Sequence, residues 1–227
     1  MSENYVFSVG GSLIVTKDGV NTEFLKKFRA FIFGQVKRGR KFYLVIGGGF
    51  TARNYIHAAL ETKAVSHFDR DSIGIEATHI NAQLLKVSFG RLAHHEIITD
   101  PTRLLKSKKP VVFAAGYKPG WSTDYDAVLI AKHNKIKTVI NLSNIDYAYD
   151  KDPRKFKNAK KLVTVNWPEF RKVVGNRWQP GLNVPFDPVA SREAARRKMK
   201  VIILNGQNLK NLAACLEGQK FQGTTIN

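Results

Sequence analysis

The sequence has a single cysteine, Cys215, among its 227 residues. This excludes an intrachain disulfide and a cysteine metal cluster. The sequence also lacks an apolar run long enough to cross a bilayer. Residues 1–4 do not begin the basic and then apolar pattern of a secretory signal. We therefore predict a cytoplasmic protein with no membrane partner.

Acidic residues are also scarce, since eighteen Asp and Glu stand against thirty-seven Lys and Arg, a net charge of +19. A field of this sign attracts nucleotides, RNA and acidic surfaces without selecting one of them. A solvated basic surface and a specific polyanion partner both remain open. The six histidines have no metal-ligand spacing, so we predict no metal site made by the protein alone.

Strand-like and helix-like stretches alternate along the chain, and 43% of the residues are hydrophobic. This favours an α/β fold with a mainly parallel open sheet and helices on both faces. We predict one domain over 1–227, with lobes of roughly 1–135 and 136–227. Predicted strands are 6–9, 42–46, 96–99, 111–115, 138–142, 201–204 and an edge strand at 223–226. Predicted helices are 25–36, 51–62, 73–87, 124–134, 167–174, 188–198 and 209–216, with loops at 151–161 and 175–185.

Three glycine-bearing turns follow three of these strands, at residues 10–12, 47–49 and 116–120. Glycine allows main-chain N–H groups to approach an anion closely, and a following helix adds the positive end of its dipole. In an open parallel sheet, ligands bind beyond the carboxyl ends of the strands. Three such turns at one edge would hold two phosphorylated molecules facing each other, as a phosphotransferase requires.

Two common phosphate motifs do not account for these turns. The P-loop signature is absent, because no glycine is followed at the right spacing by Gly-Lys-Ser/Thr. Residues 47–52 fit the loose dinucleotide pattern, with Asp69 and Asp71 about twenty residues on. That fold places the acidic residue at the end of a second strand, and residues 61–68 make a poor strand. We therefore do not assign a nicotinamide or flavin site.

The ordered set of motifs resembles the amino acid kinase superfamily and, within it, the uridylate (UMP) kinases of archaeal type. The matching segments run nearly from end to end: 9–13, 47–56, 71–75, 81–82, 119–124, 144–146, Tyr149, 152–153, 186–190 and 223–226. The resemblance implies a three-layer α/β sandwich and transfer of the γ-phosphoryl group of ATP to UMP in pyrimidine nucleotide biosynthesis. It also implies Mg²⁺ that arrives with ATP, and a homo-oligomer, either a hexamer or a dimer.

The resemblance further implies roles for individual residues. ATP would be bound by Gly10, Gly11, Ser12, Gly49, Arg53, Ser143, Asn144, Tyr149 and Asp152. UMP would be bound by Gly48, Asp71, Tyr117, Lys118, Pro119, Gly120, Trp121, Ser122 and Thr123. Arg53, Lys118 and Asp124 would act in catalysis. Plainer roles remain open, since Asp71 and residues 122–124 also suit helix N-caps and Arg53 suits a surface position.

The sequence departs from the family at three positions. Ser8 replaces a lysine that many members carry before the first glycine pair, and Lys118 or Arg53 would have to supply that charge. Tyr117 and Tyr147 stand where small residues are common. Alternatives are a different acceptor (a carboxylate, carbamate or isopentenyl phosphate), or a diverged protein with little kinase activity that binds nucleic acid or another polyanion.

Overall fold

The computed structural model describes residues 3–103, 107–177 and 184–227. Its main sheet has seven strands in the described residues, in the order β5-β4-β1-β6-β10-β11-β9. All neighbouring pairs are parallel except β10 with β11, which confirms the predicted mainly parallel α/β sheet. The strands are β1 Asn4–Val9, β4 Lys41–Ile46, β5 Val111–Ala114, β6 Thr138–Ser143, β9 Thr164–Val165, β10 Lys200–Asn205 and β11 Thr224–Ile226. Two short hairpins join β2 Val15–Thr16 to β3 Gly19–Val20, and β7 Ala148–Tyr149 to β8 Lys161–Leu162.

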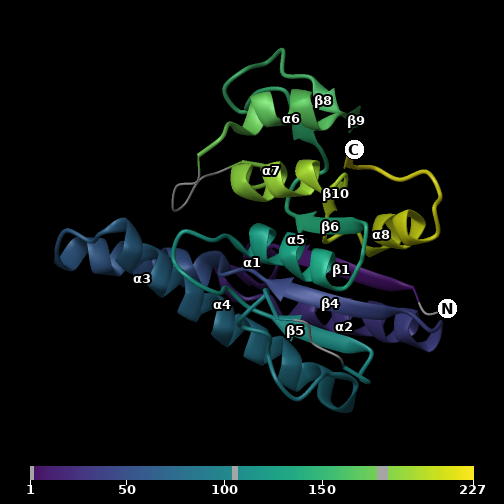
Figure 1. Cartoon of the computed structure of the whole chain (residues 1–227). Coiled ribbons are helices and arrows are strands. Elements are labelled where there is room, and N and C mark those ends of the chain that lie inside the picture. Colours follow the sequence, from purple (N-terminus) through teal and green to yellow (C-terminus); the bar gives the residue numbers. More distant parts are fainter. Residues whose placement is uncertain (1–2, 104–106, 178–183) are drawn as a thin grey trace.

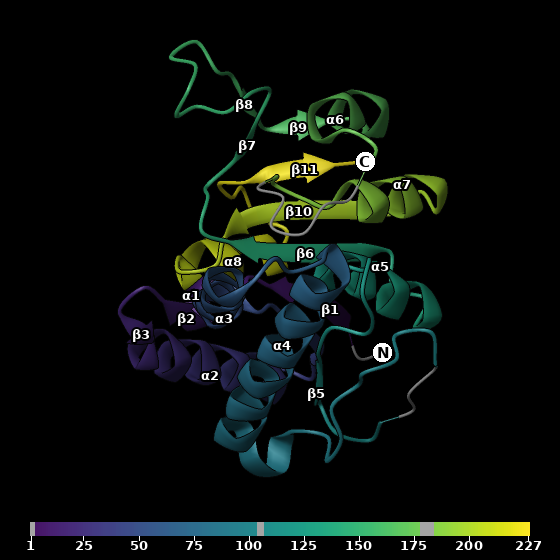
Figure 2. The same cartoon turned by 90° about the vertical axis from the view of Figure 1, so that its left-hand side faces the viewer.

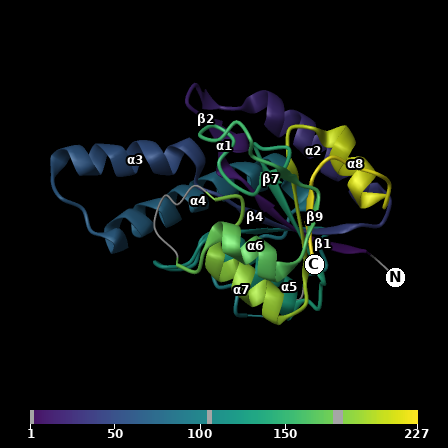
Figure 3. The ribbon, with the colours of Figure 1, turned by 90° about the horizontal axis from the view of Figure 1, so that it is seen from above.

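Helices cover both faces of this sheet (Figure 1). They are α1 Gly11–Ile14, α2 Thr22–Lys37, α3 Gly49–Thr62, α4 His67–Phe89, α5 Thr123–His133, α6 Trp167–Val174, α7 Pro188–Arg196 and α8 Leu209–Leu216, with a 3-10 turn, η1, at Gly90–Leu92. Alternate residues of each strand point to opposite faces. Phe7 therefore packs with α2, α4 and α8 in one core, and Val6 packs with α5, α6 and α7 in the other. Figure 2 and Figure 3 show the sheet between these two helical layers. No helix among the described residues is both long and apolar enough to span a membrane.

Three sequence predictions about elements were wrong. Residues 96–99 form no strand, since only isolated bridges at Ala93 and Ile98 join this segment to β5. The segment 223–226 is not an edge, because β11 pairs on both sides and β9 lies outermost. The helix predicted at 73–87 begins at His67, because Ser66 and Asp69 form a capping box before it. The loop predicted at 175–185 lies partly outside the described residues.

Two turns at the amino ends of β6 and β10 hold lysine in an unusual backbone conformation. Lys135 has φ 58° and Lys198 has φ 52°. Each follows a helix end closed by a Schellman-type hydrogen bond, from Ile136 N–H to Ala131 O (2.8 Å) and from Met199 N–H to Ala194 O (3.0 Å). Glycine usually occupies this left-handed position, because other residues are strained there.

We expect Lys135→Gly and Lys198→Gly each to raise the free energy of unfolding by about 0.5–1 kcal/mol, since relief of backbone strain outweighs the extra chain entropy of glycine. Urea unfolding of the purified variants measures this change. Lys137→Gly is the control, because Lys137 is not among the residues with positive φ and should gain nothing. A loss of stability in both left-handed variants would contradict the argument.

Candidate active site

The first and second glycine turns are in direct main-chain contact. A Cβ atom on Gly11 would lie 2.1 Å from the Gly49 nitrogen, and one on Gly49 would lie 2.2 Å from the Gly11 oxygen. Gly49 also has φ +61°. Gly47 N–H donates to Val9 O at 2.9 Å, which joins the ends of β4 and β1. The N-termini of α1 and α3 therefore meet at the carboxyl edge of the sheet, as the motif pattern predicted.

Asn81, a buried residue of α4, holds the second turn in place. Its side-chain amide donates to Gly47 O and Gly48 O, both at 3.0 Å. Thr51 Oγ1 in turn donates to Asn81 Oδ1 at 3.3 Å. These bonds satisfy the carbonyl groups of Gly47 and Gly48 and fix the turn against α4. Sequence reasoning placed Asn81 in a family motif but gave it no role.

Arg53 lies one turn into α3, beside the junction of the two turns. Its Nη2 donates to Ser12 Oγ at 3.2 Å, and its guanidinium lies 5.0 Å from the centre of the Phe50 ring. Partial burial lowers the pKa of Arg53, but an arginine stays charged at neutral pH. A cation therefore stands next to the first turn, in contact with the Ser12 side chain. Arg53 is more than a plain surface arginine, since it contacts this turn.

The third turn is attached to α4. Gly116 N–H donates to Thr78 Oγ1 at 2.7 Å, and Gly116 O lies 2.9 Å from His79 Nε2. Gly120 N–H donates to Asp71 Oδ2 at 2.7 Å. Asp71 is thus not an N-cap, because α4 begins four residues before it. Its carboxylate instead positions the loop expected to hold the acceptor.

Aromatic side chains surround Lys118 in this loop. Its ammonium lies 4.5 Å from the Trp121 ring centre and 5.3 Å from that of Tyr117. Trp121 also packs edge-on against Tyr117 and Tyr125. In the described part of the chain, no hydrogen bond or ion pair joins Lys118 to the first two turns. The aromatic faces hold its charge at the third turn, on the side expected to bind the acceptor.

Ser8 and Asp124 connect the third turn to the sheet. Ser8 Oγ donates to Asp124 Oδ1 at 2.7 Å, and Asn141 Nδ2 donates to the same oxygen at 2.8 Å. The Asp187 N–H donates to Asp124 Oδ2 at 3.2 Å. Burial raises the pKa of Asp124, and these three donors oppose the shift. Asp124 does not cap α5, because Ser122 Oγ accepts the capping bond from Tyr125 N–H. Thr123 follows Ser122 as the first residue of α5.

Asp187 is a second buried carboxyl at this site. It caps α7, accepting from Ala190 N–H at 2.6 Å, and it is 3% exposed. Burial raises its pKa from 3.8 to about 6, with a smaller contribution from the charge of Asp124. Asp187 carried no predicted role, although residues 186–190 form one of the motifs that indicated the family.

The raised pKa of Asp187 predicts a pH-dependent loss of stability. A carboxyl whose pKa is raised by folding stabilises the fold fully below its unfolded pKa, and this contribution is lost as pH rises from about 4 to 6. Asp187→Asn keeps the capping oxygen and cannot ionise. We expect the variant to gain about 3 kcal/mol over the wild type between pH 4 and pH 7. Urea unfolding across this range measures the difference, and parallel stability curves would refute the assignment.

The predicted ATP segment is only partly gathered at the turns. The Ser143 Cα lies 3.8 Å from a Cβ built on Gly10, and Asn144 follows it as an exposed residue. Tyr149 lies in the β7–β8 hairpin, and the Asp152 carboxylate is held by Arg154, with Nη2 at 2.9 Å. No hydrogen bond or ion pair among the described residues joins Tyr149 or Asp152 to the first turn. Tyr147 stands where the family pattern predicted a small residue. Its side chain is half-buried, and the Lys161 ammonium lies 5.0 Å from its ring centre.

The turns carry no cage of acidic side chains for a metal ion within the described residues. The group of three ligand atoms within 4.8 Å of one another is His94, His95 and Glu96. It adjoins Val111 at the amino end of β5, whereas the glycine turns follow the carboxyl ends of the strands. Asp124 already accepts three hydrogen bonds. A magnesium ion at the turns would therefore be held mainly by phosphate oxygens, the arrangement that Mg²⁺ favours with nucleotides.

Comparison with known proteins matches residues 5–205 to the model of the amino acid kinase family. The chain belongs to this family. It is 31% identical to a uridylate kinase of Pyrococcus abyssi, over 97% of this chain and 98% of the relative. It is 33% identical to a uridylate kinase of Methanococcus aeolicus, over 98% of both chains. A crystal structure of uridylate kinase from Archaeoglobus fulgidus superimposes with a TM-score of 0.83 at 30% identity, covering 99% of this chain and all of that one.

For this member of the amino acid kinase family, all three glycine turns and the Asn144–Asp152 segment lie inside the matched residues. Ser8, Tyr117 and Tyr147, the three positions expected to depart from the family pattern, also lie inside the matched residues. The Ser8 hydroxyl has a partner in this structure, because it donates a hydrogen bond to Asp124.

Proposed function

We propose that this protein is a nucleoside monophosphate kinase that transfers the γ-phosphoryl group of ATP to UMP, giving ADP and UDP, in the cytoplasmic synthesis of pyrimidine nucleotides. The observation that carries the proposal is the main-chain contact between the first and second glycine turns, with Arg53 beside it. Two helix N-termini and one cation converge there. Full-length similarity to proteins named uridylate kinase supports the same reaction.

The residues divide between the two nucleotides. The N–H groups of Gly11 and Ser12 would bind the ATP phosphates together with Gly49 and Arg53, and Ser143, Asn144, Tyr149 and Asp152 would hold the adenosine. Gly10 would shape the turn but not donate to a phosphate, because its N–H already donates to Leu142 O at 2.8 Å. Gly48, Asp71, Tyr117, Lys118, Pro119, Gly120, Trp121, Ser122 and Thr123 would hold UMP. Ser122 caps α5 through an oxygen lone pair, and its hydroxyl also hydrogen-bonds to the Asp187 side chain, so it would have to turn away from Asp187 to donate to a phosphate.

The reaction requires alignment and positive charge more than covalent help from the protein. An oxygen of the UMP phosphate attacks the γ-phosphorus as the bond to the bridging oxygen of ADP breaks. Arg53 would stabilise the charge on the transferred group, and Lys118 would neutralise the acceptor phosphate. Asp124 would hold the third turn against β1 through its hydrogen bond with Ser8. Mg²⁺ bound to ATP would shield the phosphate charge, held by phosphate oxygens.

A coupled assay of ADP release tests the proposal. Purified protein would be given ATP and magnesium with UMP, CMP, dUMP or a panel of carboxylates in parallel. We expect turnover with UMP and little with the carboxylates. ADP release with a carboxylate alone would assign a different acceptor, and no release with any nucleoside monophosphate would reject the kinase function.

We further propose that the protein is a homo-oligomer, a dimer or a hexamer as the family resemblance implies. The helices α3 and α4 project from the body (Figure 1), and Ile80, Leu84 and Val87 form an exposed apolar stripe along α4 at helical spacing. Light scattering should give at least twice the monomer mass, and Val87→Glu should lower it. A monomeric wild type would contradict this expectation.

A further inference from the structure

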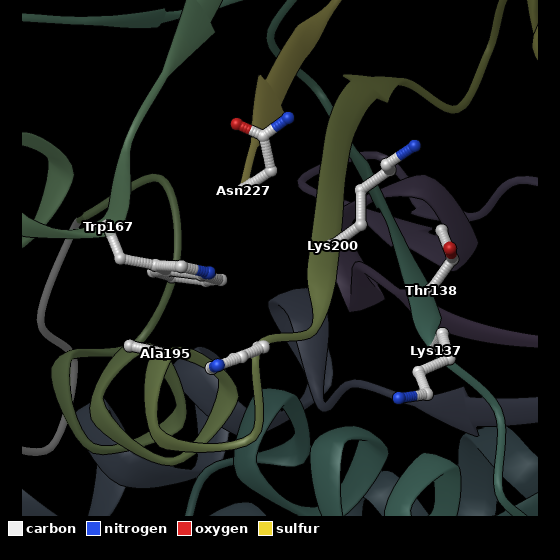
Figure 4. Close-up of a pocket in the computed structure, with 7 residues that line it drawn as sticks. Lys137, Thr138, Trp167, Ala195, Lys200 and Asn227 are labelled. Atoms are coloured by element: carbon white, nitrogen blue, oxygen red, sulfur yellow. The ribbon is translucent and has the colours of Figure 1, made fainter.

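A cavity of about 490 Å³ lies away from the glycine turns, beside the amino ends of β6 and β10. Lys137, Lys198 and Lys200 contribute to its lining. Lys200 pairs with Thr138, the residue after Lys137, so the side chains of Lys137 and Lys200 belong to opposite faces of the sheet. Figure 4 shows these two side chains pointing in different directions. Their ammonium groups do not converge, so the cavity does not form an anion site.

The third glycine turn, by contrast, is held at both of its ends by one helix, α4. Gly116 N–H donates to Thr78 Oγ1 and Gly120 N–H donates to Asp71 Oδ2, both at 2.7 Å. Thr78 follows Asp71 by about two helical turns, so the two side chains lie on the same face of α4. The loop between the two glycines carries Lys118, and its position is therefore set by α4.

The main-chain N–H groups of this loop are largely paired within the protein. Ala115 N–H donates to Ile98 O at 3.0 Å, and Trp121 N–H donates to Lys118 O at 3.1 Å. Pro119 has no N–H group, and both glycines that contact α4 are paired as well. Contact with an acceptor would therefore depend mainly on the side chains of the loop. The direction in which the loop presents those side chains becomes the feature that the protein must control.

His79 of α4 makes a further contact with this loop, at the carbonyl group of Gly116. Its Nε2 lies 2.9 Å from Gly116 O. A carbonyl oxygen only accepts hydrogen bonds, so Nε2 must carry the hydrogen. Thr78 and His79 thus bind the N–H and the C=O of the same glycine. Gly116 also lies close against the helix, since a Cβ there would be 3.1 Å from Thr78 Oγ1 and 3.3 Å from Ile75 Cγ1.

The other contacts of His79 contribute little. Its Nδ1 lies 3.9 Å from a carboxylate oxygen of Glu76, whose side chain is 80% exposed. An ion pair with so exposed a partner adds little stability, because water screens it. Within the described residues, the hydrogen-bond partner of the His79 ring is Gly116 O. The effect of His79 is therefore exerted mainly on the loop.

The same helix also holds the second glycine turn. Asn81, two residues after His79, donates to Gly47 O and Gly48 O, both at 3.0 Å. One helix therefore contacts both the turn that adjoins the first glycine turn and the loop that carries Lys118. Phosphoryl transfer depends on the alignment of donor and acceptor. The hydrogen bonds of α4 would set the distance between the two groups.

We propose that His79 is a positioning residue for the acceptor. Through Gly116 O it fixes the direction in which the third turn presents Lys118 to the UMP phosphate. His79 acts through the loop and does not itself touch the nucleotide. The inference rests on the proposed function, since it takes the third turn as the site of UMP.

Steady-state kinetics of His79→Leu and His79→Gln, with ATP and UMP varied in turn, tests the proposal. Leucine removes the donor, whereas the amide of glutamine can still donate to Gly116 O. We expect the KM for UMP to rise about tenfold in His79→Leu, the effect of losing one hydrogen bond to a buried carbonyl. The KM for ATP should stay within twofold, and His79→Gln should recover most of the loss. Thermal unfolding checks that both variants fold, as a side chain that is 33% exposed leads us to expect.

His57→Leu is the matched control. His57 lies on α3 and also has an acidic neighbour on its own helix, with Nδ1 3.4 Å from Glu61, but its side chain is exposed. This variant should leave both KM values unchanged. A wild type without UMP turnover would reject the proposed function and this inference with it. Normal turnover with the same KM for UMP in the wild type and His79→Leu would overturn this inference alone, as would an equal rise of both KM values in His79→Leu.

Discussion

A Gly11→Ala variant is expected to lose phosphoryl transfer by at least about 100-fold in kcat/KM and about 3 kcal/mol of stability. The added Cβ would lie 2.1 Å from the Gly49 nitrogen and 2.5 Å from the Gly47 oxygen. Both are main-chain atoms, so no side chain can rotate away to make room. The first and second turns must separate, and the N–H groups of both turns then lose their alignment toward the phosphates.

Gly34→Ala is the matched control for this variant. Gly34 lies inside α2, and a Cβ there would meet nothing within 4 Å. Alanine in an open helix position should stabilise the protein by about 0.5–1 kcal/mol and leave turnover unchanged. Steady-state kinetics and thermal unfolding of both variants provide the comparison. Full activity in Gly11→Ala would show that the contact between the turns is not needed for the reaction.

The fold was largely predictable because its signals are local. Buried strands such as 111–115 are followed by glycine, and helices such as 167–174 and 209–216 were predicted with the bounds observed. The failures were at the sheet margins. Residues 96–99 have strand-like composition but make only one isolated bridge, at Ile98, and nothing local shows that β9 would cover β11.

The candidate site was less predictable because its polar contacts join distant segments. Ser8 and Asp124 are 116 positions apart, and Asn141 joins them only because β1 and β6 pair with Ser8 opposite Asn141. A sequence without that register gives no reason to connect the three residues. Ser8 was consequently interpreted as a missing charge, whereas the structure shows a hydrogen-bond donor. The role of Asp71 was also obscured, because its partner is a main-chain N–H group at Gly120.

Composition gave the total charge but not its position. Thirty-seven basic residues predict attraction of anions, and the Lys-apolar-Lys turns at 135–137 and 198–200 are visible in the sequence. These two turns lie side by side because β6 and β10 are adjacent, although almost sixty residues separate the two strands in the sequence. The same parallel pairing that brings the glycine turns together at the carboxyl ends of the strands brings these two turns side by side at the amino ends.

An Arg53→Ala variant is expected to lower kcat by about 100- to 1,000-fold, with a much smaller effect on stability. Removing one preorganised donor to a developing anionic charge typically has this effect. The loss should appear in kcat, because the role proposed for Arg53 is to bind the transferred group more strongly in the transition state than in ATP. Arg53→Lys should recover part of the activity, since it restores charge without the two parallel hydrogen bonds of a guanidinium.

Arg91→Ala separates this effect from the loss of one charge out of a strongly basic surface. Arg91 is exposed in η1, beside the amino end of β5 and away from the glycine turns. Its removal should leave kcat unchanged within twofold. Within the described residues, Arg53 makes one side-chain hydrogen bond, to Ser12, so its loss should change the free energy of unfolding by no more than about 0.5 kcal/mol. Equal activity losses in Arg53→Ala and Arg91→Ala would contradict the proposed contact between Arg53 and the transferred phosphoryl group. The loss in Arg53→Ala would then reflect only the long-range attraction of nucleotides to a basic surface.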